Sequence, residues 1–95
     1  MVQTSNWDLD LATYHLLHDI DRHYFRGDRQ VNVDSMLAQT VRAAVDTALI
    51  TMPAAPEPVA GLVSLPLVHA ELTDAGRSQL ATLAADPHIQ EKLNG

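Results

Sequence analysis

Apolar residues recur at helical spacing over residues 7–26, and this periodicity predicts a long first helix. Ser5 or Asn6 stands just before it as a candidate N-cap, and Gly27 follows it as a C-terminal stop. With a rotation of about 100° per residue, one arc of this helix carries five apolar side chains that we expect to face the core: Leu9, Leu16, Leu17, Ile20 and Tyr24.

The same helix has a second, separate apolar arc. Either this arc packs inside the domain, so that the helix is sandwiched, or it meets a protein partner or a second copy of the chain. Few other large residues remain to cover it, so we favour the partner. The predicted partner-binding residues, which include three of the four aromatic residues of the chain, are Trp7, Leu11, Tyr14, His18 and Phe25.

A second helix is predicted to follow a polar turn over residues 27–30. Asn32 or Asp34 can serve as its N-cap, and the periodic pattern extends to residue 52. One stripe of this helix is apolar and is expected to face inward: Leu37, Val41, Ala44, Ala48 and Met52.

The remaining chain alternates breakers with short elements. Residues 53–58 contain three prolines, which favour an extended, semi-rigid connector inside the domain. Residues 61–72 are rich in branched apolar residues and predict one or two strands, with Pro66 at an edge or bend. Thr73 then caps a helix to residue 85, and the Asp-Pro pair after it restarts a short helix to residue 93.

This order of elements predicts one α+β domain over residues 1–95, mainly helical, with a long N-terminal helix and a small β-hairpin. The alternative is a small all-α bundle.

The segment Glu71-Leu-Thr-Asp-Ala-Gly-Arg-Ser-Gln-Leu80 resembles the region that leaves the wing in winged-helix transcription regulators of the MarR and PadR type. The resemblance implies a winged-helix-like architecture. Such regulators place a helix-turn-helix before the wing, with a recognition helix rich in basic and polar residues. Here that helix has Arg42 as its single basic residue, so no DNA-contacting residue is carried over.

Three of the five histidines lie within residues 15–25. His15, Asp19 and His23 are spaced by four residues each and form a row along the first helix. At about 1.5 Å rise per residue, the ends of this row lie roughly 12 Å apart, so one metal ion could not bind all three. We interpret the row as the solvated side of the helix and predict no metal site.

The chain carries a formal net charge of −6, which disfavours binding to a phosphate backbone. The expected partner is therefore a protein or a second copy of the chain. A DNA-binding regulator remains the alternative, in which dimer formation would gather four basic residues onto one face: Arg22, Arg26, Arg29 and Arg42.

No phosphate-binding loop, dinucleotide fingerprint, nucleophile elbow or zinc-protease motif occurs in the sequence. We therefore expect a non-enzymatic interaction or regulatory module without a cofactor. The first twelve residues lack the basic and apolar regions of a secretory signal, and the longest apolar run is too short to cross a bilayer. A cytoplasmic protein that does not enter the membrane is the expectation.

Overall fold

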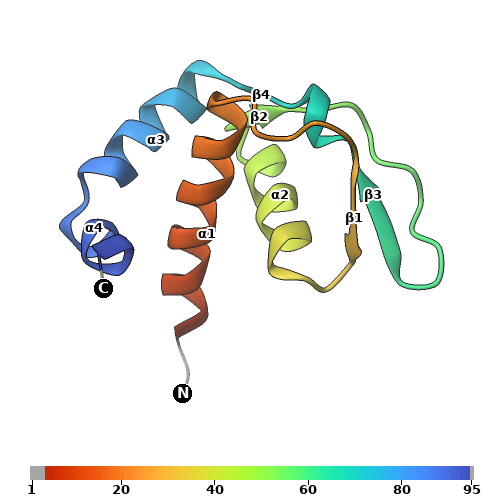
Figure 1. The fold of residues 1–95 in the computed structure, drawn as a ribbon, viewed down its shortest axis with the longest axis horizontal. Helices are drawn as coiled ribbons and strands as arrows, with labels where there is room; N and C mark the ends of the chain where they lie inside the picture. Colours follow the sequence, from red (N-terminus) through yellow and green to blue (C-terminus); the bar gives the residue numbers. More distant parts are fainter. Residues whose placement is uncertain (1–3, 95) are drawn as a thin grey trace.

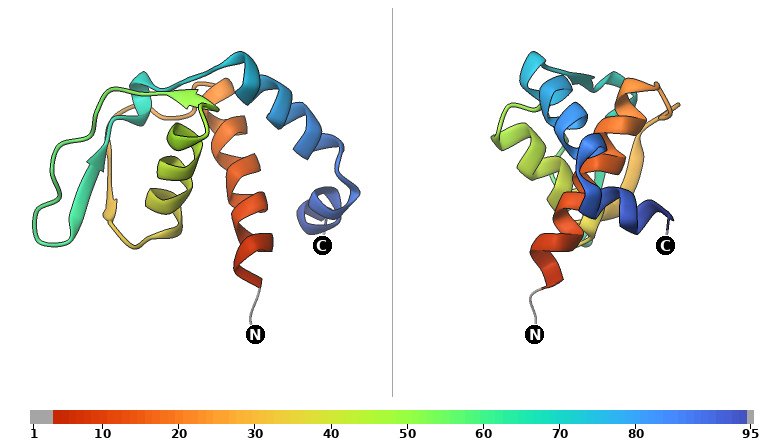
Figure 2. Two further views of the ribbon diagram at one scale, coloured as in Figure 1. Left: turned by 180° about the vertical axis from the view of Figure 1, so that it is seen from behind. Right: turned by 90° about the vertical axis from the view of Figure 1, so that its left-hand side faces the viewer.

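The computed structural model describes residues 4–94, and the side chains of residues 9–91 (Figure 1). The fold is α+β, with four helices and two small antiparallel strand pairs in the described chain. Helix α1 (Thr4–Asp21) lies between α2 (Met36–Asp46) on one side and α3 (Asp74–Ala85) with α4 (Pro87–Asn94) on the other, as Figures 1 and 2 show. The long N-terminal helix therefore occupies the centre of the molecule, and the expected α+β class is confirmed over its all-α alternative.

Helix α1 ends at Asp21, so the prediction that it reaches Arg26 is wrong. His23 adopts a left-handed conformation (φ 56°), its N–H donates to the carbonyl of Ile20, and the N–H of Tyr24 donates to the carbonyl of Asp19. These two bonds form a Schellman motif that closes the helix with a histidine where glycine is usual. Tyr24 therefore leaves the helix and is 60% exposed, and its expected place in the core stripe is wrong.

Helix α2 begins after Ser35, whose side chain accepts a hydrogen bond from the N–H of Ala38. It ends at Asp46, and a second Schellman motif with Ala48 in the left-handed conformation (φ 60°) stops it. The prediction of a helix to residue 52 is wrong because Ile50 enters strand β2 (Ile50–Thr51), where its side chain is fully buried.

The strands pair over long distances in the chain. Strand β3 (Leu62–Leu65) pairs with β1 (Arg29–Asn32), a segment expected to be partly turn, and β4 (Glu71–Leu72) pairs with β2. The expectation of one or two strands over residues 61–72 is confirmed, with Pro66 at the bend between them. These two strands do not pair with each other, so the small hairpin predicted from this segment is replaced by two separate pairs.

The proline-rich residues 53–58 have no regular structure and are exposed, as expected for a connector. A tight turn comes after it, in which Val59 and Leu62 exchange two backbone hydrogen bonds around Ala60 and Gly61. Both central residues have positive φ, 56° and 78°, which is typical of a type I′ turn. This turn returns the chain to β1, and the N–H of Val33 donates to the carbonyl of Gly61.

The core is one cluster to which every helix contributes. Leu16, Leu17 and Ile20 of α1 form its centre, as their arc predicted. They pack with buried residues from all the other described helices, from strands β2, β3 and β4, from the 3-10 turn at Leu67–His69 and from the residue after that turn: Val41, Ala44, Ile50, Leu65, Leu67, Ala70, Leu72, Leu83 and Ile89.

Helix α3 begins after its predicted N-cap, Thr73, which also bonds to the residues that follow α2. The Thr73 hydroxyl donates to the carbonyl of Ala48 (2.6 Å), lies 3.1 Å from the carbonyl oxygen of Leu49, and accepts from the N–H of Gly76 (3.0 Å). The N–H of Thr73 also donates to the carbonyl of Leu49. One side chain thus serves as the N-cap of α3 and as a tie to a segment 24 residues earlier.

Replacing Thr73 with valine is expected to reduce the free energy of unfolding by about 2 kcal/mol, because it removes the cap and leaves the carbonyl of Ala48 without its side-chain donor. Urea denaturation measures the change. Thr73→Ser is the matched control, since it keeps the hydroxyl and is expected to stay close to the wild type. Equal stability of the valine variant and the wild type would contradict the double role of this side chain.

Candidate functional site

Three residues of the predicted partner-binding arc lie together on α1. The ring of Tyr14 stacks on that of His18, with centroids 5.6 Å apart and an angle of 26° between the planes. Leu11 precedes them by about one turn, and all three side chains are half-buried. We call these three residues the α1 patch; Leu11 and Tyr14 pack against the core while all three keep part of their surface exposed.

The other two predicted members of the arc are not placed in this patch. Phe25 lies beyond the end of α1 and borders a different hollow, together with His15, Asp19 and Met36. Its removal from the arc follows from the early end of the helix, because the chain turns away at His23. The side chain of Trp7 lies outside the part of the chain whose side chains are described.

The two sides of α1 predict different responses to truncation. His15→Ala is expected to change the free energy of unfolding by no more than about 0.5 kcal/mol, because His15 is exposed, whereas Tyr14→Ala is expected to cost about 2 kcal/mol through lost packing against the core. Chemical denaturation of the two variants measures the difference. Equal losses of unfolding free energy at the two positions would contradict the assignment of a solvent-exposed side and a packed side to α1.

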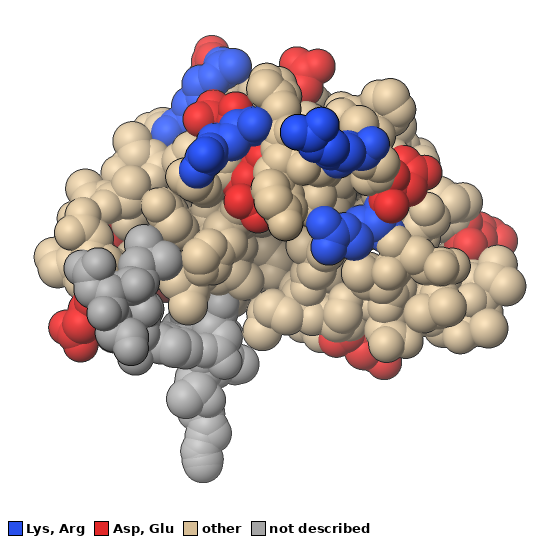
Figure 3. Space-filling model, in the orientation of Figure 1, with Lys and Arg blue, Asp and Glu red and all other residues tan. Residues whose placement is uncertain are grey.

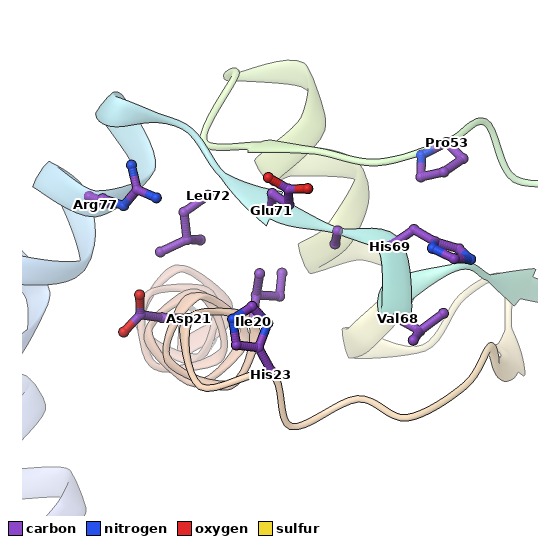
Figure 4. A pocket seen from close by; sticks show the side chains of 10 residues that line it. Ile20, Asp21, His23, Pro53, Val68, His69, Glu71, Leu72 and Arg77 are labelled. Carbon is purple, nitrogen blue, oxygen red and sulfur yellow. The ribbon is translucent and has the colours of Figure 1, made fainter.

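The largest hollow described, of about 610 Å³, lies between the end of α1, the segment before β4 and the start of α3. Figure 4 shows Arg77 and Asp21 at one end of the hollow, His69 near the other, and Ile20 with His23 between them. Glu71 also lines it, and all of its charged side chains are exposed while Ile20, Ala70 and Leu72 form an apolar floor.

This hollow does not assemble an acid–base centre within the described residues. Its histidines make no described side-chain hydrogen bond to a carboxylate, so no base is held by an orienting group. Nor does the described part of the chain contain any group of three or more metal-ligating side chains. His69 shares the hollow with His23, not with His15 and His18, which are the neighbours that a composite metal site on α1 would need.

Figure 3 shows Arg side chains gathered over the upper half of one face, above the end of α1, the segment that leads into β1 and the start of α3, with Asp and Glu among them. Of the four arginines in the DNA-binding alternative, Arg22, Arg26 and Arg29 belong to residues 22–29 of this region. Arg42 lies on α2, where it borders hollows together with Asp46. Arg42 therefore lies near acidic residues, and neither of these two hollows is lined by the other three arginines.

Sequence reasoning missed the hollow at Arg77 and Glu71, because its lining comes from segments about 50 residues apart. It also missed the grouping of Tyr24, Phe25 and Arg29 near the end of α1, where the Arg29 guanidinium lies 5.4 Å from the centre of the Phe25 ring. The helix ends early because His23 adopts the left-handed conformation. Glycine is the usual residue at such a position and would have signalled the helix end in the sequence, whereas histidine did not.

No family model, curated protein or solved structure matches this chain. Among the described helices, none combines the length and apolar character that crossing a bilayer requires.

Proposed function

We propose that this chain is a non-enzymatic interaction module that docks a protein surface, or a second copy of itself, through the α1 patch. The observation that carries the proposal is the stacked Tyr14–His18 pair, in which Tyr14 packs against the core and both side chains are partly exposed. Rigid, half-buried aromatic groups are common anchors of protein interfaces because they bury a large area at a low entropic cost.

The surroundings of the patch suit docking better than catalysis. His18 lies 3.9 Å from Asp19, and both side chains are more than one third exposed, so this pair is only weakly coupled. A polar, solvated border around an apolar centre is the usual composition of a protein interface. Among its three residues there is no serine, threonine or cysteine that His18 could activate.

Self-association through this patch predicts a specific effect of charge. His18→Glu is expected to shift the protein toward the monomer in sedimentation velocity at increasing concentration, because a carboxylate would replace the ring that stacks on Tyr14 within the interface. His15→Glu is the matched control, since it makes the same change three residues away at an exposed position. A wild-type protein that stays monomeric over the whole concentration range would exclude self-association.

A winged-helix DNA-binding regulator is the second candidate, supported by the segment at the start of α3. In this segment Leu72 ends a strand, Thr73 caps the helix and Gly76 lies against Leu49. One observation speaks against this candidate. Strand β1 lies between α1 and α2, and α2 is followed by strand β2, so these helices do not form the closely turned pair of a helix-turn-helix.

A fluorescence anisotropy titration with duplex DNA fragments tests the second candidate. A duplex-binding regulator is expected to bind at low salt, to weaken steeply as salt rises, and to lose affinity in Arg42→Gln, since Arg42 is the one basic residue of α2. An absence of binding at low salt would remove this candidate and leave the protein-docking module.

A further inference from the structure

The aromatic residues just after α1 form a surface of their own. Tyr24 is 60% exposed, and its ring meets that of Phe25 edge to face at 5.5 Å and 81°. The Arg29 guanidinium lies 5.4 Å from the Phe25 ring centre. We call residues 22–29, which contain this group, the aromatic–arginine loop.

The fold exposes Tyr24 by ending the helix early. The left-handed residue His23 turns the chain, and the N–H of Tyr24 is bound to the carbonyl of Asp19. The backbone of the aromatic side chain is therefore fixed while its ring lies in solvent. Phe25 is half-buried and packs against the core, so the exposed Tyr24 ring contacts a side chain that is itself held in place.

The aromatic–arginine loop is positively charged in an acidic protein. It contains Arg22, Arg26 and Arg29 against the single carboxylate of Asp28, so three positive charges and one negative charge give +2, within a chain whose formal charge is −6. The ion pairs found among the described residues involve none of these three arginines. Their guanidinium groups are therefore not held by an ion pair within the described chain, and Figure 3 shows Arg side chains, with Asp and Glu among them, over this part of the face.

We propose that the aromatic–arginine loop binds single-stranded nucleic acid, with a base stacked on Tyr24 and the neighbouring phosphates paired with Arg22, Arg26 and Arg29. An exposed ring beside several cations is the combination that single strands require, because every base has a face to stack and each nucleotide carries a phosphate. A duplex hides its base faces, and residues 22–28 present neither a helix nor a strand that could enter its groove. The surface is distinct from the α1 patch, so this inference does not depend on self-association.

Fluorescence anisotropy of the full chain with labelled dT12 at low salt tests the proposal. Tyr24→Ala is expected to weaken binding roughly 5- to 150-fold, the range for losing one base stack, while Tyr24→Phe, which keeps the ring, is expected to bind like the wild type. Tyr24 is largely exposed, so circular dichroism should show the same fold in all three proteins.

A matched pair of arginine variants tests the phosphate contacts. Arg26→Gln is expected to lower the slope of log affinity against log salt by about 0.7, the value for one phosphate contact on a single strand. Arg42→Gln makes the same change in net charge on α2 and is expected to leave the slope unchanged.

Three results would overturn the proposal: no binding of dT12 at low salt, equal binding by Tyr24→Ala and the wild type, or tighter binding of a duplex of the same length. Tighter binding of the duplex would favour the DNA-binding regulator. In the arginine test, an equal loss of affinity in Arg26→Gln and Arg42→Gln would also contradict the proposed site, because it would indicate attraction by the overall charge alone.

Discussion

Gly76→Ala is expected to destabilise the protein by about 3 kcal/mol or more, because the new methyl group would overlap the backbone of Leu49. A Cβ built at Gly76 meets the Leu49 carbonyl oxygen and lies 3.0 Å from its carbon. This carbonyl accepts the hydrogen bond from the N–H of Thr73, so it cannot retreat without loosening the tie between α3 and the exit of α2. The measurement is the free energy of unfolding from urea denaturation.

Gly27→Ala is the control for this prediction. A Cβ at Gly27 meets no atom within 4 Å, so alanine there is expected to change the free energy of unfolding by no more than about 0.5 kcal/mol. Similar costs at both glycines would show that the close approach of α3 to Leu49 does not limit the residue at position 76.

Leu17→Ala is expected to cost about 3 to 5 kcal/mol, because it would open a cavity at the centre of the core. Leu17 has no exposed surface, and α1 is enclosed by α2 on one side and by α3 and α4 on the other (Figure 1). Elements on two sides of the helix would have to move together to fill the space. Thermal and urea denaturation should both detect the loss.

Leu17→Met is the control for this prediction, because it changes the side chain without removing its volume from the core. Methionine has nearly the same volume and adapts to an irregular site, so a cost below about 1.5 kcal/mol is expected. An alanine variant as stable as the methionine variant would mean that the centre of the core collapses readily, and that α1 is not held from both sides.

Features that depend on neighbouring residues could be predicted from the sequence. Thr73 has a hydroxyl that can bond the N–H three residues later, and its role as the cap of α3 follows from that local geometry. The three prolines of residues 53–58 prevent helix within six residues. The arc of Leu16, Leu17 and Ile20 is fixed by helical rotation alone, and it forms the core as expected.

The ends of α1 and α2 depend on packing between distant segments. Neither His23 nor Ala48 is a glycine, so each left-handed conformation costs about 1 kcal/mol or more locally. We attribute the compensation to residues just downstream of each turn, because Phe25 packs against the core and Ile50 is buried beside Leu72. Their packing partners lie far away in the chain, so a prediction from the local pattern extends both helices beyond their true ends.

The candidate surfaces divide in the same way. The spacing of Leu11, Tyr14 and His18 placed them on one arc, and the structure keeps them together because all three lie within α1. Phe25 was assigned to that arc by helical rotation, but the chain turns at His23 and carries it to Tyr24 and Arg29. Residues within one helix keep the relations that rotation gives them, whereas residues beyond its end take the positions that long-range packing allows.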